Sequence, residues 1–232
     1  MNFLSFNTLP VLDLVALGLF VATWGAYALT VEWSQSRKSS LNALMNVYRD
    51  VWMNRMLARE QRMVDTQIVG SLQNGTAFFA STSLIAIGAV LTVLRATDEV
   101  LNVIATLPIG IVTTRAQWEI KVVGLAIIFV YAFFKFAWSY RLFNYLAIMV
   151  GATPDHSEKD SPEAKSHALR AGRLCASAGR HFNHGQRAFF FALGYLGWFL
   201  GPWPFMVSTL AVTFVMWQRQ FASDSRRAVL EP

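Results

Sequence analysis

The chain has few charged residues and a single cysteine, and both features limit the classes of protein to which it can belong. Charged residues make up 15% of its 232 positions, whereas an ordinary soluble domain has about a quarter. The single cysteine, Cys175, excludes an internal disulfide and a zinc site built from cysteines. Asp, Glu, Lys and Arg are missing altogether from three long stretches: 14–31, 66–94 and 188–218.

These stretches and a fourth, 122–150, are rich in apolar residues. The fourth contains only Lys135 and Arg141 as charged residues. Crossing a hydrocarbon layer takes about 20 helical residues. We therefore predict an all-α, polytopic helical membrane protein with a single membrane domain over residues 1–232. The expected spans are about 10–31, 68–94, 120–150 and 187–218, and the expected cytoplasmic segments are 32–67 and 151–186.

The last apolar stretch has two interpretations. As one helix it would be about 46 Å long at 1.5 Å per residue, but Gly201-Pro202-Trp203-Pro204 interrupts it. Glycine favours the end of one helix and proline the first turn of the next. The stretch is thus either one kinked span or a hairpin of 185–201 and 204–219. The hairpin agrees better with the basic residues of the tail, since it returns the tail to the side of the other basic segments.

Basic residues alternate between the connections. Segments 32–65 and 151–187 each carry six Lys or Arg, whereas 95–121 carries three. Because cytoplasmic connections are enriched in Lys and Arg, we expect both basic segments inside and the N-terminus outside the inner or plasma membrane. The net charge of +6 then reflects orientation and anionic lipid headgroups as partners, not nucleic acid.

The first cytoplasmic segment is predicted to be an amphipathic helix. An apolar stripe follows helical spacing at Leu41, Leu44, Met45, Tyr48, Val51, Trp52 and Met56. A basic amphipathic helix between spans most simply lies in the headgroup plane. The alternative is that it docks on a partner subunit or on the second cytoplasmic helix.

The second cytoplasmic segment has a helix start at Ser161-Pro162-Glu163, with serine as the N-cap. One face of the helix holds small residues, which favour close packing: Ala164, Ala168, Ala171, Gly172, Cys175, Ala176 and Gly179. The opposite face is cationic, and we expect four of its residues to bind anions or lipid headgroups: Arg170, Arg173, Arg180 and Arg187.

Two sets of residues are weaker site candidates. His181 and His184 share a helical face at metal-ligand spacing, but His167 is about 21 Å away along the helix and cannot complete a site with them. Polar residues near or within the spans could line a solute pathway, with snorkelling as the alternative for the lysine: Lys135, Asn74, Gln73 and Asp65. No cofactor and no catalytic residues are predicted.

Several phrases of the sequence carry a resemblance to a known family. They are Asp65-Thr66-Gln67 followed by Phe79-Ala80-Ser81-Thr82-Ser83-Leu84, then Arg141 with Phe143 and Asn144, then Arg187-Ala188-Phe189-Phe190, and finally Trp198-Phe199-Leu200-Gly201-Pro202-Trp203. Together they resemble domain-of-unknown-function family 599, a membrane family of bacteria and plants. The resemblance implies a multi-span architecture over nearly the whole chain, and it transfers no catalytic residues.

Three functions are compatible with these features. The favoured one is a non-enzymatic homo-oligomer with a small-solute or ion pathway, which we expect between subunits because few spans enclose little space. The alternative is a lipid-interacting scaffold or assembly factor. The second alternative is a membrane-bound metal protein or enzyme.

Overall fold

The computed structural model describes residues 9–36, 40–106 and 113–230, and within these ranges it is helical without any strand. Eight α-helices are present in the described part: α1 Val11–Ser36, α2 Leu41–Leu57, α3 Met63–Arg95, α4 Thr97–Thr106, α5 Arg115–Gly151, α6 Pro162–Tyr195, α7 Pro202–Phe221 and α8 Asp224–Leu230. Two short 3-10 helices, η2 His156–Glu158 and η3 Leu196–Leu200, lie before and after α6.

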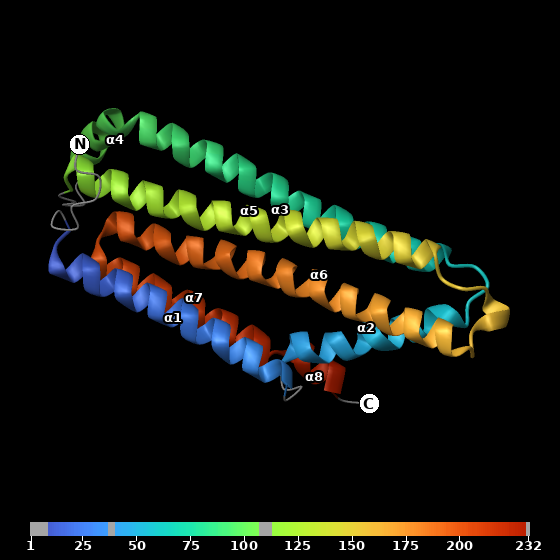
Figure 1. Ribbon diagram of the computed structural model, residues 1–232. Coiled ribbons are helices and arrows are strands. Elements are labelled where there is room, and N and C mark those ends of the chain that lie inside the picture. Colours follow the sequence, from blue (N-terminus) through green and yellow to red (C-terminus); the bar gives the residue numbers. More distant parts are fainter. Residues whose placement is uncertain (1–8, 37–39, 107–112, 231–232) are drawn as a thin grey trace.

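The long helices are arranged in a row (Figure 1). Helix α3 packs against α5, α5 against α6, α6 against α7 and α7 against α1. One hydrophobic core joins α1, α5, α6 and α7, and it includes Phe20, Phe136, Phe191 and Phe205. A second core lies where α2 meets α5 and α6, and it includes Met53, Met56 and Leu146.

Three helices in the described residues are long and apolar enough to cross a membrane: Val11–Ser34, Met63–Arg95 and Arg115–Gly151. They correspond to the first three predicted spans, and α3 and α5 extend beyond the predicted ends. Large apolar side chains cover much of their outward surface, as Ile85 and Phe134 show at 73% and 65% exposure. The fourth predicted segment is not one long span. It is divided between the end of α6, η3 and α7.

The chain turns between α6 and α7 at Gly201, whose φ of 133° favours a residue without a side chain. Pro202 then occupies the first turn of α7, where its missing N–H costs no helical hydrogen bond. Helix α7 runs back alongside α1, because Trp198 contacts Asp13 at one end and the Tyr27 hydroxyl donates to the Met216 carbonyl near the other. Of the two interpretations of this stretch, the structure has the hairpin.

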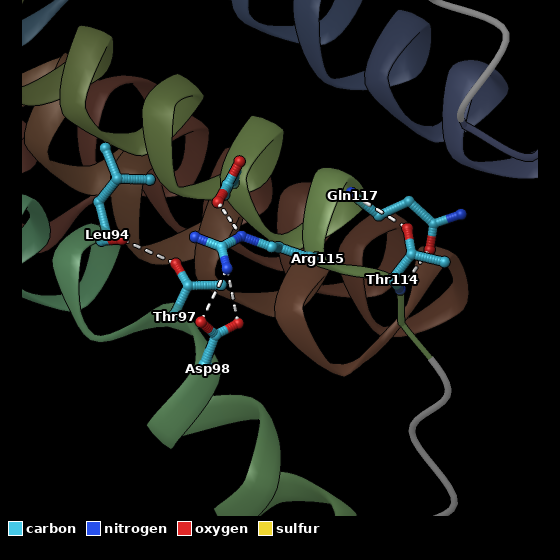
Figure 2. A network of polar contacts seen from close by, with 7 residues as sticks. Leu94, Thr97, Asp98, Thr114, Arg115 and Gln117 are labelled. Carbon is cyan, nitrogen blue, oxygen red and sulfur yellow. Dashed lines mark hydrogen bonds and ion pairs between the residues drawn. The ribbon is translucent and has the colours of Figure 1, made fainter.

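Polar contacts connect the helices where the end of α3, helix α4 and the start of α5 meet (Figure 2). Thr114 and Gln117 form a reciprocal capping box at the start of α5. Arg115 donates to Asp98 of α4 at 2.7 and 2.9 Å and to Glu119 at 2.8 Å. All three charged groups are exposed, so this network orients α4 and adds little stability.

Helix α2 docks on α6, which was the alternative to the headgroup plane (Figure 1). The face towards the bundle carries Ala43, Met53 and Met56, whereas Met45 and Tyr48 of the predicted stripe are exposed. A position of the exposed residues in the headgroup plane stays a prediction.

The small face of α6 lies in that contact, as predicted. Its members are buried except Ala176, which is half-buried. A Cβ on Gly172 would lie 2.6 Å from an Asp50 carboxylate oxygen, and one on Gly179 would lie 2.6 Å from the Arg49 guanidinium. Burial raises the pKa of the Cys175 thiol to about 11, so this thiol stays protonated at neutral pH. The predicted cap at Ser161 and Pro162 is also confirmed.

Candidate functional site

A polar cavity of about 170 Å³ lies where α1, the start of α2, α6 and α7 meet. We call it the Arg187 pocket. Its apolar wall is formed by Val31, Leu41, Phe190 and Met216. Its polar lining consists of Tyr27, Asn42, Asn183, Gln186, Arg187, Arg219 and Gln220. The lining contains two cations and no carboxylate, so the pocket is positively charged.

Arg187 is the most buried charge in the pocket, at 6% exposure. Its guanidinium lies 5.4 Å from the centre of the Tyr27 ring. No hydrogen bond or ion pair within 4 Å joins it to another described residue, although the Glu32 carboxylate of α1 acts on it electrostatically. Burying a cation without a partner is costly, and an aromatic face compensates for only part of that cost. This arginine therefore has donors available for a ligand.

Helix α7 contributes Arg219 and Gln220 from the opposite wall. The Arg219 guanidinium lies over the Phe190 ring at 5.4 Å. Gln220 is 9% exposed, and its amide nitrogen is buried without a hydrogen-bond partner in the part of the chain that the structure describes. Buried polar groups are normally hydrogen-bonded, so the Gln220 amide is a second donor in this lining that is available to a ligand.

The donor set fits an oxyanion. Guanidinium and amide N–H groups form short, charge-assisted hydrogen bonds with phosphate and carboxylate oxygens. The cavity has room for several water molecules, and a phosphate group is of comparable size.

A second buried polar cluster lies at the other end of α1. Asp13 and Lys121 are 6% and 7% exposed, and Lys121 Nζ is 3.5 Å from Asp13 Oδ1. The same ammonium donates to the Trp198 carbonyl at 3.0 Å, and the Trp198 indole N–H donates to Asp13. The cluster ties α1, α5 and η3 together, and each of its charges has a partner inside it.

A third cluster surrounds Asp65, which is fully buried at the start of α3. The Trp52 indole N–H donates to Asp65 Oδ1 at 2.7 Å, and Arg59 forms an ion pair with the same oxygen. This carboxylate holds α2 to α3. The predicted role of Asp65 in lining a pathway gains no support from these contacts.

The other predicted pathway residues are dispersed. Gln73 donates to Asn144 at 2.6 Å, and Asn74 is exposed on the outer face of α3. Lys135 lies in a surface groove on α5, with its ammonium over the Tyr131 ring at 5.2 Å. The structure does not bring these residues to one cavity of the protomer. A pathway between subunits stays a prediction.

The predicted cationic face of α6 is divided in two. Arg170, Arg173 and Arg180 are exposed, whereas Arg187 is buried in the pocket. The His181 and His184 rings are 6.3 Å apart, and His184 Nε2 is 3.5 Å from a Glu32 oxygen. Within residues 9–36, 40–106 and 113–230 no group of three or more metal-ligating side chains is present, and the predicted metal role stays a prediction.

Together these features define the class: an all-helical protein with three helices fit to cross a membrane and a cationic pocket between four of its helices. The chain belongs to the family described as protein of unknown function, DUF599, whose model matches residues 15–225. The resemblance predicted from the sequence is thus confirmed. No curated protein and no solved structure matches the chain.

Sequence reasoning found Arg187 but missed the rest of its site. Arg219, Gln220 and Asn42 come from other helices, and no local spacing connects them to α6. The Asp13–Lys121 pair was missed for the same reason. A signal existed for that pair, because each charge lies where an apolar segment begins.

Proposed function

We propose that this protein is a multi-pass membrane protein that binds a phosphate-bearing anion in the Arg187 pocket, either as a lipid headgroup or as a free anion. The observation that carries the proposal is the buried Arg187 guanidinium without a hydrogen bond or close ion pair to a described residue, in the same cavity as the unpartnered Gln220 amide. This is the lipid-interacting function that the sequence left as an alternative, now attached to a defined cavity.

The proposal includes a topology of five crossings: α1, α3, α5, the end of α6 with η3, and α7. It is supported by the apolar surface of the first three helices and by the hairpin at Gly201. An odd number of crossings places Arg219, Arg226 and Arg227 on the same side as the six basic residues of segment 151–187. The positive-inside rule then assigns that side to the cytoplasm and places the pocket at the inner headgroup level.

The orientation can be tested with a cysteine at an exposed position of α6. In a Cys175→Ser background, Arg173→Cys should react with a membrane-impermeant maleimide only after the cells are opened. A matched cysteine at Asp98, which is exposed in the first turn of α4, should react in intact cells. The reverse pattern would contradict the proposed orientation and move the pocket to the outer surface.

Ligand binding is the direct test of the pocket. Arg187→Gln should weaken binding of phosphatidylglycerol or inorganic phosphate about tenfold to 100-fold, because a hydrogen bond to a charged group contributes about 1.5–3 kcal/mol. Arg219→Gln removes an exposed donor of the same pocket and should act in the same direction without disturbing packing. Affinities would be measured by titration of purified protein in detergent and in nanodiscs.

The control is Arg173→Gln, which removes an equal charge from the exposed face of α6. It should leave both affinities unchanged. Saturable binding of inorganic phosphate in detergent would identify a free anion as the ligand, whereas binding of the phospholipid alone would identify a headgroup. Wild-type affinity for both probes in Arg187→Gln and Arg219→Gln would disprove the proposed function.

A further inference from the structure

A second cationic depression lies on the surface of α5 and α6. We call it the Lys135 groove. It has a volume of about 420 Å³ and is lined by Phe134, Lys135, Ala137, Trp138, Arg141 and His181. Its three titratable residues are all bases, so it carries no negative charge of its own.

None of these bases has a carboxylate partner in the described part of the chain. Lys135 contacts the face of Tyr131, and Arg141 donates to the Tyr145 hydroxyl at 2.7 Å while lying 5.9 Å from the Trp138 ring centre. The Nδ1 atom of His181 is buried and has no hydrogen-bond partner. Aromatic rings therefore orient the cations and leave their N–H groups available to an anion.

The groove lies on a surface of α5 that carries both apolar and basic side chains. Ile127 and Phe134 are 63% and 65% exposed. Arg141 lies about 9 Å beyond Lys135 by helical rise. Tyr131, Trp138, Tyr140 and Tyr145 are all exposed to 40% or more, as expected for an aromatic belt at a membrane interface.

We infer that the Lys135 groove binds the phosphate of an anionic phospholipid from the inner leaflet, with the acyl chains along the apolar surface of α5. The charge of the groove selects the headgroup. The exposed Phe134 and Ile127 explain why the ligand is a lipid and not a soluble anion. Snorkelling of Lys135 towards the headgroups is part of this arrangement. The inference does not depend on the Arg187 pocket, which α1, α2 and α7 form on a different side of α6.

Native mass spectrometry of the full chain can count and rank bound lipids. Titrated with phosphatidylglycerol, the double variant Lys135→Gln/Arg141→Gln should lose one tightly bound lipid, with its apparent affinity at that site about tenfold lower. Both residues are at the surface, so the variant should keep the elution volume and unfolding temperature of the wild type. His181→Gln should give a smaller loss at the same site.

The matched control is Lys165→Gln/Arg170→Gln, which removes the same charge from exposed positions of α6 and should bind lipid like the wild type. The Arg187→Gln variant should keep the lipid of the groove, so failure of the pocket proposal is recognised separately. Unchanged phosphatidylglycerol binding by the Lys135→Gln/Arg141→Gln variant would overturn the inference. An equal loss of phosphatidylcholine, or displacement of the lipid by millimolar inorganic phosphate, would overturn it as well.

Discussion

Replacing Lys121 by methionine is expected to lower the free energy of unfolding by about 3–5 kcal/mol, because it leaves the Asp13 carboxylate buried without its counter-ion. Asp13 is 6% exposed, so water cannot take over the role of the ammonium. The substitution also removes the donor to the Trp198 carbonyl in η3. Unfolding would be followed by far-ultraviolet circular dichroism in mixed micelles.

The double variant Asp13→Asn/Lys121→Met separates charge burial from packing. It removes both charges and should recover at least about 2 kcal/mol of the loss, since the cost of the single variant comes mainly from the stranded charge. Lys165→Met, at an exposed position of α6, should change stability by less than about 0.5 kcal/mol. If the single and double variants are equally unstable, the pair contributes through shape and not through charge.

Phe136→Ala is expected to destabilise the protein by a similar amount, about 3–5 kcal/mol, because deletion of a buried ring leaves a cavity. The ring is fully buried on α5 and lies 5.3 Å from Phe79 of α3 and 5.6 Å from Phe182 of α6, measured between ring centres. It also lies against Gly185, where a Cβ would come within 2.7 Å of it. Phe136 thus joins α3, α5 and α6.

Phe134 provides the control two residues earlier on the same helix. It is 65% exposed on the apolar surface, so Phe134→Ala should cost less than about 0.5 kcal/mol. Both variants would be measured in the same micelles, so the detergent contribution cancels. Equal losses would contradict the assignment of inner and outer faces to α5, and with it the position of the Lys135 groove.

Much of the fold could be predicted because apolar length is a local property. The apolar runs around Phe20, Ile85 and Phe134 are continuous in the sequence, and each of them forms a long helix in the structure. The start of α6 at Ser161 and its small-residue face were predictable for the same reason, since capping and close packing depend on residues three or four positions apart.

Helix α2 shows where such reasoning stops. Its apolar stripe left open the headgroup plane, a partner subunit and the second cytoplasmic helix, and only the structure shows that Arg49 and Asp50 lie against glycines of α6. The spacing of apolar residues along a helix shows which face of the helix is most hydrophobic. It does not show which neighbouring element the helix packs against, and for α2 that element is α6.

By itself the sequence determined that the chain is helical, that long apolar helices dominate it, and which family it belongs to. These follow from residue type and spacing along one helix. Only the tertiary structure decided that Arg187 faces Gln220, that Asp13 pairs with Lys121, and that Lys135 faces outwards beside His181. Each of these juxtapositions joins residues from different helices, and their distances are set by how the helices pack.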